Sequence, residues 1–399
     1  MSLILSNKAK AIKTSPTLAV FSKARKMIDN GIDTINFSVG EPDFNTPDYV
    51  KKAAYDAIKN NFTRYTVAAG IPELKEAIIK KMKNDNNLDY CYENIIVTPG
   101  AKAAIATILT AICNPGDQVI IPTPYWVSYP SQVELADGFP VILETEAKDD
   151  FKIDPKQLDK LLSSLPNGKA LILNSPSNPS GMVYKKDELK AIAEVCVKHN
   201  IIIISDEIYE KLIYGNTKHW PIADISEETK KLTVIINGIS KAYAMTGWRL
   251  GYAVGPEEII SKAVKIQSHT ASCINSITQK ATVAALTIDD GSLEKMRQEF
   301  EKRKIYITKA LNDIEHINCI EPQGAFYCLP DVSYYIKNNT IGITDDVQLC
   351  TWFLEKHKIA IVPGSAFGIN NFIRFSYANS LENLQEGIRR FQNGCNELI

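Results

Sequence analysis

The sequence of 399 residues lacks several features that would assign it to a special class of protein. No segment reaches about 18 uninterrupted apolar residues, so we expect no membrane span. The N-terminus has a short apolar run, but neither the long hydrophobic stretch nor the small-residue cleavage site of a secretory signal. There is also no internal repeat, low-complexity tract or linker rich in Gly and Ser. These absences favour a globular protein without a membrane partner.

Cysteine and histidine are too scattered to form the usual ligand patterns. The eight cysteines include no C-x-x-C pair, which argues against both a zinc pattern and a disulfide framework. The five histidines are isolated from one another, so we expect no metal site. Scattered cysteines in a chain of this size are typical of a reducing compartment, where they behave as small apolar residues. We therefore expect a cytoplasmic protein.

Neither sign of charge is in excess. Lys and Arg together number 45, and Asp and Glu 46, which gives a net charge of -1 at pH 7. Nothing global directs the chain to nucleic acid or to an anionic membrane, so a small anionic ligand has to be bound by local groups. Apolar residues make up 45% and charged residues 23%, as in ordinary globular proteins. The length is enough for two or three domains and a large core.

Short apolar runs alternate with helical patterns from about residue 46 to residue 290. The runs span 95–98, 118–121, 141–144, 170–174, 201–205, 234–237 and 249–254, and one of the helical segments between them spans 186–199. This alternation predicts an α/β fold with a mostly parallel sheet covered by helices on both faces. A long charged helix over 293–311, followed by shorter strands and two further helices, predicts a second, smaller α+β domain.

The N-terminal end of the chain is expected to join this smaller domain. Residues 18–30 form a short amphipathic helical pattern, and residues 36–42 form an extended piece that ends in a turn. We therefore predict a large domain over residues 46–290 and a discontinuous small domain made of residues 1–45 and 291–399.

One lysine and one arginine stand eight residues apart in a tract, 240–249, that has no other charge. Small and apolar neighbours favour burial of Lys241, and burial disfavours its charged form, which leaves an amine able to attack a carbonyl. Arg249 stays charged and has the planar shape that suits a phosphate. An aldehyde that also carries a phosphate is pyridoxal 5'-phosphate (PLP), so the tract predicts a PLP site. The alternative is a solvated surface lysine that precedes a strand.

Polar residues follow the apolar runs at the edge of the predicted sheet where ligands of α/β proteins bind. Asp206 follows the run 201–205, and its carboxylate could keep a pyridine nitrogen protonated, so that the ring accepts electrons. The alternative role of Asp206 is a helix N-cap, and Glu207 is a second carboxylate that we expect to point away. Tyr209 shares the face of Asp206 if a helical turn begins here. With the Asn178 amide, the Tyr209 hydroxyl could bond the phenolic oxygen of PLP.

Three weaker signals lie elsewhere in the chain. Gly100, Ala101 and Lys102 follow a strand and open a helix, where backbone N–H groups could bind phosphate, although a plain helix start explains the pattern equally well. Trp126 could stack on the cofactor ring or be a core aromatic residue. Tyr65, in a polar stretch, could reach a phosphate, although a surface turn fits the pattern better.

Arg374 lies in an alternating strand among apolar residues, where a charged side chain should be paired. The partner could be a protein carboxylate, or the carboxylate of a substrate bound in bidentate fashion. The sequence offers no obvious acid nearby, which favours the substrate.

Eight motifs stand in order along nearly the whole chain. They are 38–44 (SVGEPDF), 64–66 (RYT), 124–129 (PYWVSY), 174–181 (NSPSNPSG), 205–209 (SDEIY), 240–249 (SKAYAMTGWR), 324–327 (GAFY) and 373–376 (IRFS). With these motifs the chain resembles the class I aminotransferases of the PLP-dependent fold-type-I superfamily. It is most similar to the aspartate aminotransferase branch found in many bacteria, some members of which also transaminate prephenate.

The resemblance implies roles for the residues of the cofactor site. Lys241 would form a Schiff base with PLP and then shuttle a proton between the substrate Cα and the cofactor. Asp206 would pair with the pyridine nitrogen, and Trp126 would stack on the ring. The phenolic oxygen would bond to Tyr209 and Asn178. The phosphate would be held by Arg249, Ser240, the amides of Gly100, Ala101 and Lys102, and Tyr65 from the partner subunit.

The resemblance also implies a substrate site and a homodimer with shared active sites. Arg374, the Gly40 amide and Asn178 would bind the α-carboxylate of an amino acid, and Trp126 would lie beside the substrate. Lys13 aligns with a lysine that, in this branch, approaches the distal carboxylate of a dicarboxylic substrate. A solvated N-terminal lysine is the alternative. The expected partners are amino-acid and 2-oxo-acid substrates and a second subunit.

We therefore expect an aspartate aminotransferase that passes the amino group of L-aspartate to 2-oxoglutarate, with prephenate as a further candidate acceptor. Alternatives on the same fold are an alanine or aromatic aminotransferase and a C–S lyase. A non-catalytic PLP-binding regulator is the alternative from another class, but such proteins usually carry an additional DNA-binding domain.

Many relatives have Ser or Gly in place of Ala101, and some branches have a hydroxyl residue in place of Gly238. We expect these two departures to weaken PLP binding modestly.

Overall fold

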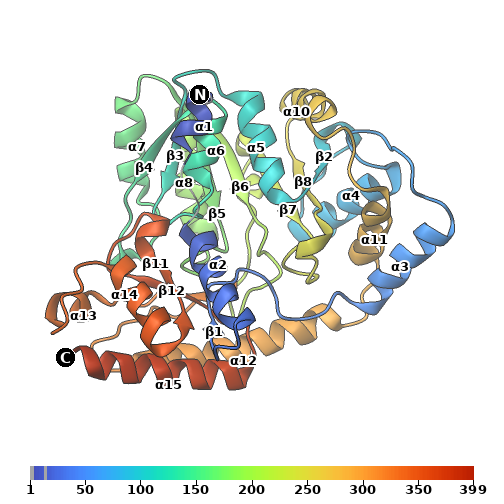
Figure 1. Cartoon of the computed structure of the whole chain (residues 1–399). Coiled ribbons are helices and arrows are strands. Elements are labelled where there is room, and N and C mark those ends of the chain that lie inside the picture. The colour runs from blue at the N-terminus through green and yellow to red at the C-terminus, as the bar shows by residue number, and fades with distance from the viewer. Residues whose placement is uncertain (1–3, 13–15) are drawn as a thin grey trace.

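The computed structural model describes residues 4–12 and 16–399. Its centre is a seven-stranded sheet with the strand order β2-β8-β7-β6-β5-β3-β4 (Figure 1). The strands are β2 (Ile95–Thr98), β3 (Gln118–Pro122), β4 (Phe139–Leu143), β5 (Gly168–Asn174), β6 (Ile202–Asp206), β7 (Thr233–Gly238) and β8 (Gly251–Val254). Neighbouring strands run parallel except at β8, which is antiparallel to both β2 and β7. The expected α/β fold with a mostly parallel sheet is confirmed.

Helices cover both faces of this sheet because its strands are apolar on both sides. One face packs against α5 (Ala101–Ile112), α6 (Tyr129–Leu135) and α10 (Glu257–Thr270). Toward β4, the other face packs against α7 (Pro155–Ser164) and α8 (Lys186–Lys198). Toward β2, that face packs against α3 (Asp48–Lys59), α4 (Pro72–Asn86) and α11 (Ser276–Thr287). The sheet is therefore a rigid frame, and the loops at its strand ends are held by elements buried on both sides.

A second, smaller group of strands brings the two ends of the chain together. β1 (Ile35–Asn36) pairs in parallel with β10 (Ile359–Ala360). β9 (Tyr327–Cys328), β11 (Val362–Pro363) and β12 (Ile373–Ser376) form an antiparallel sheet in the order β11-β12-β9. The division of the chain at residues 46 and 290 stays a prediction, and the pairing of β1 with β10 is what such a discontinuous domain requires.

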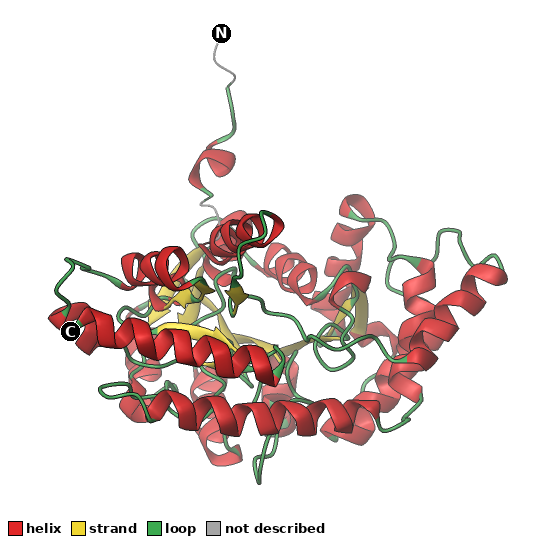
Figure 2. Ribbon diagram, turned by 60° about the horizontal axis from the view of Figure 1, so that its bottom comes forward, coloured by secondary structure: helices red, strands yellow, loops and turns green. Residues whose placement is uncertain are grey.

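Two long helices pack side by side next to these strands. They are α12 (Ser292–Asn312) and α15 (Leu381–Leu398), and Figures 1 and 2 show them along the same side of the molecule. Both contribute buried apolar residues to one cluster that also contains Phe37 and Phe375. In the part of the chain that the structure describes, no helix combines the length and the apolar character needed to cross a membrane.

The remaining helices are short or peripheral. They are α1 (Asn7–Ala11), α2 (Pro16–Asp29), α9 (Glu227–Leu232), α13 (Ser333–Asn338) and α14 (Asp346–Trp352). α1 stands out from the body of the molecule in Figure 2. It contacts the body through Lys8, whose Nζ donates to the Asp137 carboxylate at 2.9 Å.

Candidate active site

A pocket of about 400 Å³ lies where the carboxyl ends of the parallel strands meet the second group of strands. It gathers most of the side chains and backbone positions that the sequence motifs single out. These are Gly40, Ala101, Lys102, Trp126, Asn178, Asp206, Tyr209, Ser240, Lys241, Arg249 and Arg374. Asp206 ends β6, and Ser240 and Lys241 follow β7, so the sheet topology itself brings these residues to one edge.

Among the described residues, Tyr65 and Gly100 are predicted site residues that do not line this pocket, although Gly100 directly precedes Ala101, which does. Tyr65 lies in the loop after α3 and is 91% exposed. Its placement matches a surface turn within this subunit, and the predicted contact with phosphate requires a second subunit. Lys13 lies outside the described residues, so its predicted role stays a prediction.

Lys241 is the amine of the pocket. Its Nζ donates to the carbonyl oxygen of Gly40 at 2.5 Å. Burial lowers the pKa of Lys241 to about 8, and the nearby Arg374 and Arg249 guanidiniums act in the same direction, against the opposite pull of Glu41 and Asp206. A lysine with this pKa is partly neutral near physiological pH, so it is not the solvated surface lysine that the sequence left open.

Asp206 is buried at the end of β6, with 4% of its surface exposed. The Tyr129 hydroxyl donates to its Oδ2 at 2.6 Å, and the Ile208 N–H donates to Oδ1 at 3.3 Å. Burial raises the pKa of Asp206 to about 6, although both of these donors favour the ionised form. The segment after β6 is a turn and not a helix, so Asp206 does not cap a helix. The alternative carboxylate, Glu207, does point away from the pocket: it accepts from Ser205 Oγ at 2.8 Å.

Tyr209 and Tyr327 both line the pocket, and their hydroxyl groups are hydrogen-bonded to each other. Their hydroxyl oxygens are 2.9 Å apart, and burial raises the pKa of both phenols. Tyr327 also closes the space beside Gly40, because a Cβ added there would lie 2.8 Å from the Tyr327 hydroxyl. Sequence reasoning assigned roles to neither Tyr129 nor Tyr327, although both lie in quoted motifs. Their only sequence signal was an aromatic residue at a fixed place in those motifs.

Arg374 is a buried guanidinium without a carboxylate partner. One amino group donates to Asn178 Oδ1 at 2.9 Å and the other to the Ser38 carbonyl at 2.8 Å, while Nε has no partner. In the described part of the chain, no Asp or Glu pairs with it. Burial lowers the pKa of Arg374, yet an arginine stays charged in proteins. The protein carboxylate considered from the sequence is therefore ruled out within these residues, and the site suits an external carboxylate.

The start of α5 and Arg249 form a corner suited to phosphate. α5 begins at Ala101 without a side-chain cap, so the N–H groups of its first residues, Ala101 and Lys102, can bind an anion. The predicted Gly100 N–H instead donates to the Thr98 carbonyl at 2.7 Å. Gly100, with a φ of 92°, leaves the space that the Arg249 guanidinium approaches: an added Cβ would lie 2.6 Å from Nη2. Arg249 is anchored by donating to the Thr246 carbonyl at 2.7 Å. A helix N-terminus and a cation therefore converge at one end of the pocket.

Lys102 and Trp126 occupy the neighbouring wall. The Lys102 Nζ lies 4.9 Å from the centre of the Trp126 ring, and burial together with Arg249 lowers the pKa of Lys102. Trp126 also makes an edge contact with Tyr129, with ring centres 5.4 Å apart. Since Trp126 is only partly buried and lines the pocket, it is not solely a core residue.

The packing around residue 238 explains why a glycine stands there, which the sequence alone did not show. A Cβ at this position would lie 2.9 Å from the Gly251 Cα and 3.0 Å from the Leu250 carbonyl oxygen. A hydroxyl residue could not be accommodated here without movement of β8. The glycine is therefore explained by the close approach of β7 and β8.

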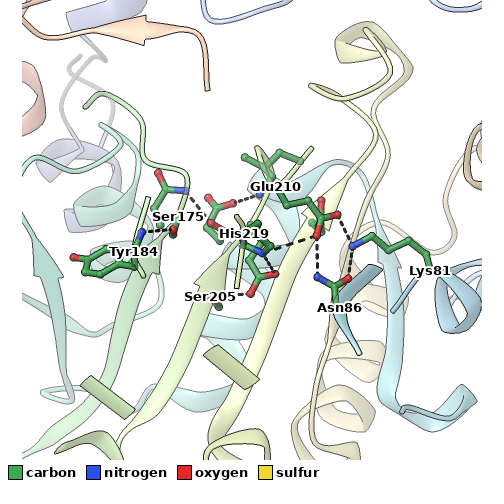
Figure 3. A network of polar contacts seen from close by, with 12 residues as sticks. Lys81, Asn86, Ser175, Tyr184, Ser205, Glu210 and His219 are labelled. Atoms are coloured by element: carbon green, nitrogen blue, oxygen red, sulfur yellow. Dashed lines mark hydrogen bonds and ion pairs between the residues drawn. The ribbon is translucent and has the colours of Figure 1, made fainter. Parts of the chain in front are cut away.

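The described residues also gather Glu207, Glu210 and His219, with their ligand atoms within 4.8 Å of one another. This cluster could not be predicted from the sequence, in which His219 is isolated from the other histidines. Lys81 forms an ion pair with Glu210, as Figure 3 shows, so the cluster already contains a cation.

Comparison with known proteins identifies the family. The family profile for aminotransferases of class I and II matches residues 32–391. The chain belongs to this family. The aspartate aminotransferase of Bacillus sp. (strain YM-2) is 45% identical over 390 residues, which cover 98% of each chain. The aspartate/prephenate aminotransferase of Nitrosomonas europaea is 44% identical over 391 residues, which cover 97% of this chain and 98% of that one.

Solved structures of aminotransferases share the fold. The crystal structure of the aspartate aminotransferase from Rhizobium meliloti matches with a TM-score of 0.96 at 37% identity and covers 100% of both chains. The aspartate aminotransferase from Thermus thermophilus, solved with maleate, matches with a TM-score of 0.93 at 38% identity, over 98% of this chain and 100% of that one. The resemblance drawn from the sequence motifs is therefore confirmed for the aminotransferase family and its fold.

Proposed function

We propose that this aminotransferase binds PLP and transfers the amino group of L-aspartate to 2-oxoglutarate in two alternating half-reactions. One observation carries the proposal. A single pocket contains an amine of lowered pKa, Lys241, together with a buried carboxylate, Asp206, and a buried guanidinium without a carboxylate partner, Arg374. These three groups match an aldehyde, a pyridine nitrogen and a substrate carboxylate.

The residues present fit PLP. The corner formed by the start of α5 and Arg249 offers the N–H groups of Ala101 and Lys102 and a guanidinium for the phosphate, and Ser240 lines the same pocket. Asp206 would hold the pyridine nitrogen, Tyr209 and Asn178 the phenolic oxygen, Trp126 the ring face and Lys241 the aldehyde carbon. When bound, PLP supplies an electron sink that lowers the barrier to removing a proton from the α-carbon of an amino acid.

The protein's own side chains would carry the proton and orient the substrate. Lys241 Nζ, partly neutral at its pKa of about 8, would take the proton from the substrate Cα as a general base. Arg374 and Asn178 would fix the α-carboxylate and so hold the Cα proton within reach of Lys241. Asp206 would keep a proton at the pyridine nitrogen, where its carboxylate is shielded from water.

A dicarboxylic substrate is supported by two observations. Both sequence relatives described above are named for aspartate, and the Thermus thermophilus relative was solved with maleate, a dicarboxylate. Lys102 lines the pocket, and in the described residues no carboxylate pairs with it, so it supplies a further positive charge. Lys13 stays a second candidate for the distal carboxylate.

A homodimer is the assembly we propose, with Tyr65 of one subunit reaching the phosphate corner of the other. Support comes from the exposed apolar side chains of Tyr55, Ile58, Tyr65 and Val67, which lie together in sequence on α3 and the loop after it. Light scattering during gel filtration would measure the mass. A monomer at micromolar concentration would contradict the shared active site.

The half-reaction with aspartate is the decisive test of function. The PLP-loaded protein is mixed with L-aspartate in the absence of any oxo acid, and its visible absorption is recorded. We expect loss of the yellow band, with pyridoxamine phosphate and oxaloacetate formed in equal amounts. A yellow band that aspartate leaves unchanged would overturn the aspartate assignment. Alanine, aromatic and thioether amino acids, tested in the same way, would then separate the alternative aminotransferases from a C–S lyase.

A further inference from the structure

The five-residue segment from Asp206 to Glu210 directs some of its side chains into the pocket and others away from it. Asp206 and Tyr209 line the pocket, whereas Glu207 and Glu210 do not. Glu207 and Glu210 enter instead a buried polar cluster, which we call the anchor network. Its members are Lys81, Asn86, Ser205, Glu207, Glu210 and His219. Each cofactor-facing residue is therefore the immediate neighbour of a glutamate of the anchor network.

The anchor network ties two separate parts of the chain to this segment. Lys81 and Asn86 come from α4, and His219 comes from the loop after the segment. His219 Nε2 lies 2.9 Å from Glu207 Oε2, and Asn86 Nδ2 donates to Glu210 Oε2 at 3.0 Å. Lys81 pairs with Glu210 and also donates to Asn86 Oδ1 at 2.5 Å (Figure 3). The segment is thus held by side chains on the side away from the pocket.

Backbone hydrogen bonds connect these glutamates to the residues that line the pocket. The Glu207 N–H donates to the Ile236 carbonyl of β7 at 2.9 Å, and the Glu210 N–H donates to the Glu207 carbonyl at 2.9 Å. The turn is therefore short and closed on itself. A displacement of either glutamate would move Asp206 or Tyr209, because no free residue separates them.

The charges of the anchor network make it resistant to displacement. Burial alone would raise the pKa of Glu210, but Lys81, His219 and Asn86 outweigh it and bring the pKa to about 2. A buried carboxylate that stays ionised attracts its lysine strongly in a medium of low dielectric constant. The network contains its own cation in Lys81, so we assign it no metal.

We propose that Glu207 and Glu210 are positioning residues for the cofactor site. They hold Asp206 at the pyridine nitrogen and Tyr209 at the phenolic oxygen, without touching either group themselves. This inference rests on the proposed PLP function. It predicts that loosening the anchor network weakens PLP binding and changes the electronic environment of the bound cofactor, beyond any loss of stability.

The test compares Glu207→Gln and Glu210→Gln with a matched control, Glu188→Gln. Glu188, on α8, also pairs with a buried lysine, Lys152, at 3.0 Å, but neither residue lines the pocket. For each purified holoenzyme, three quantities are measured. They are the melting temperature, the PLP dissociation constant by titration of the stripped protein, and the pH midpoint at which the visible band of the loaded protein shifts.

We expect both anchor variants to bind PLP more weakly, by a factor of about ten or more. We also expect the pH midpoint of the visible band to move by about 0.5 pH units or more. The control should lower the melting temperature while leaving the dissociation constant within about twofold and the midpoint unchanged. Anchor variants that melt earlier but match the control in PLP affinity and midpoint would overturn the positioning role.

Folding failure and failure of the proposed function are separated by two further measurements. If Glu210→Gln does not fold, the double variant Lys81→Met/Glu210→Gln removes both charges together and is measured in its place, with the same expected loss of PLP affinity. Wild-type protein that forms no visible band with PLP would contradict the proposed function. Wild-type protein that binds PLP, with anchor variants that behave as the control does, would contradict only this inference.

Discussion

Two buried charged clusters lie on opposite sides of the same short turn, and their ionisation is shifted in opposite ways. On the pocket side, burial raises the pKa of Asp206 to about 6 and lowers that of Lys241 to about 8, so both groups are shifted toward their neutral forms. On the anchor side, Lys81 and its neighbours outweigh burial and hold the pKa of Glu210 at about 2. The difference comes from pairing, since both clusters are buried.

This contrast separates a site built for a ligand from a site built for the fold. Within residues 4–12 and 16–399, Asp206 has two hydrogen-bond donors but no ion pair with a cation, and Arg374 has a free Nε and no carboxylate partner. The anchor network supplies its own counter-charges. Groups left without counter-ions reduce the stability of the free protein and are available to a bound molecule. The predictions below test this contrast.

Replacing Lys241 by Ala should have the largest effect. The pocket would lose the amine at the proposed aldehyde position, and turnover should fall by about 10⁴-fold or more. Steady-state assay of aspartate and 2-oxoglutarate conversion measures the change, with Lys83→Ala, an exposed lysine paired to Asp89, as the control. Appreciable activity in the Lys241→Ala protein would remove Lys241 from the mechanism.

Replacing Arg374 by Lys should have the next largest effect. Lysine keeps the charge but not the two-pronged geometry that suits a carboxylate, so kcat/KM should fall by about 10² to 10³-fold. The loss should appear with every amino acid tested, because all share the α-carboxylate. If KM for aspartate rises but that for alanine does not, Arg374 binds the distal carboxylate instead.

Replacing Glu210 by Gln should destabilise the protein by about 3–5 kcal/mol, because Lys81 would be left buried and unpaired. The pKa of Glu210 is lower in the folded protein than in the unfolded chain, so its stabilising effect is present above about pH 4.5. That effect is lost as the pH falls toward 2. Urea unfolding at pH 7 and at pH 4 measures the difference, which should be smaller at the lower pH.

Replacing Asp206 by Asn should act in the opposite direction on the protein without PLP. Because its pKa is higher in the folded protein than in the unfolded chain, ionised Asp206 destabilises the fold, increasingly from about pH 4 to about pH 6. The variant should therefore gain about 1–3 kcal/mol at pH 8 and less at pH 5. A loss of stability at pH 8 in urea unfolding would mean that the Tyr129 bond outweighs the cost of burial.

Replacing Tyr129 by Phe should have the smallest effect. Asp206 would lose the hydroxyl that favours its ionised form, and PLP affinity should fall by about threefold to tenfold. The pH profile of PLP binding should move upward, because Asp206 would ionise at a higher pH. An unchanged profile would show that Tyr129 only fills space beside Trp126.

Much of the fold could be predicted from apolar runs. The run at 95–98 is β2 itself, and the helical pattern over 186–199 becomes α8, Lys186–Lys198. The order of the strands and the reversed direction of β8 could not be predicted, because they depend on contacts between distant segments. The run at 249–254 predicted a longer strand than β8, since Arg249 instead takes a left-handed backbone conformation before it.

The site could be predicted only where a single residue stands out from its neighbours by its charge. Lys241, Asp206 and Arg374 stand out as charges in apolar surroundings, and the expectation that Glu207 points away from the pocket is confirmed. Tyr129 and Tyr327 carry no such signal, because an aromatic residue in a motif fits a core role equally well. The anchor network could not be predicted for another reason: Asn86 and Glu210 lie 124 residues apart in sequence and meet only in the fold.

The pairing of β1 with β10 sets the order in which the halves of the pocket can be completed during synthesis. Asp206 ends β6 and Lys241 follows β7, and the last strand of their sheet along the chain ends at Val254. Gly40 follows β1, which has to wait for Ile359 and Ala360 before it can pair. Ribosomes would add the intervening residues over about 5 to 20 seconds. A nascent chain can therefore assemble the part of the pocket that contains Asp206 and Lys241 before β1 places Gly40 beside them.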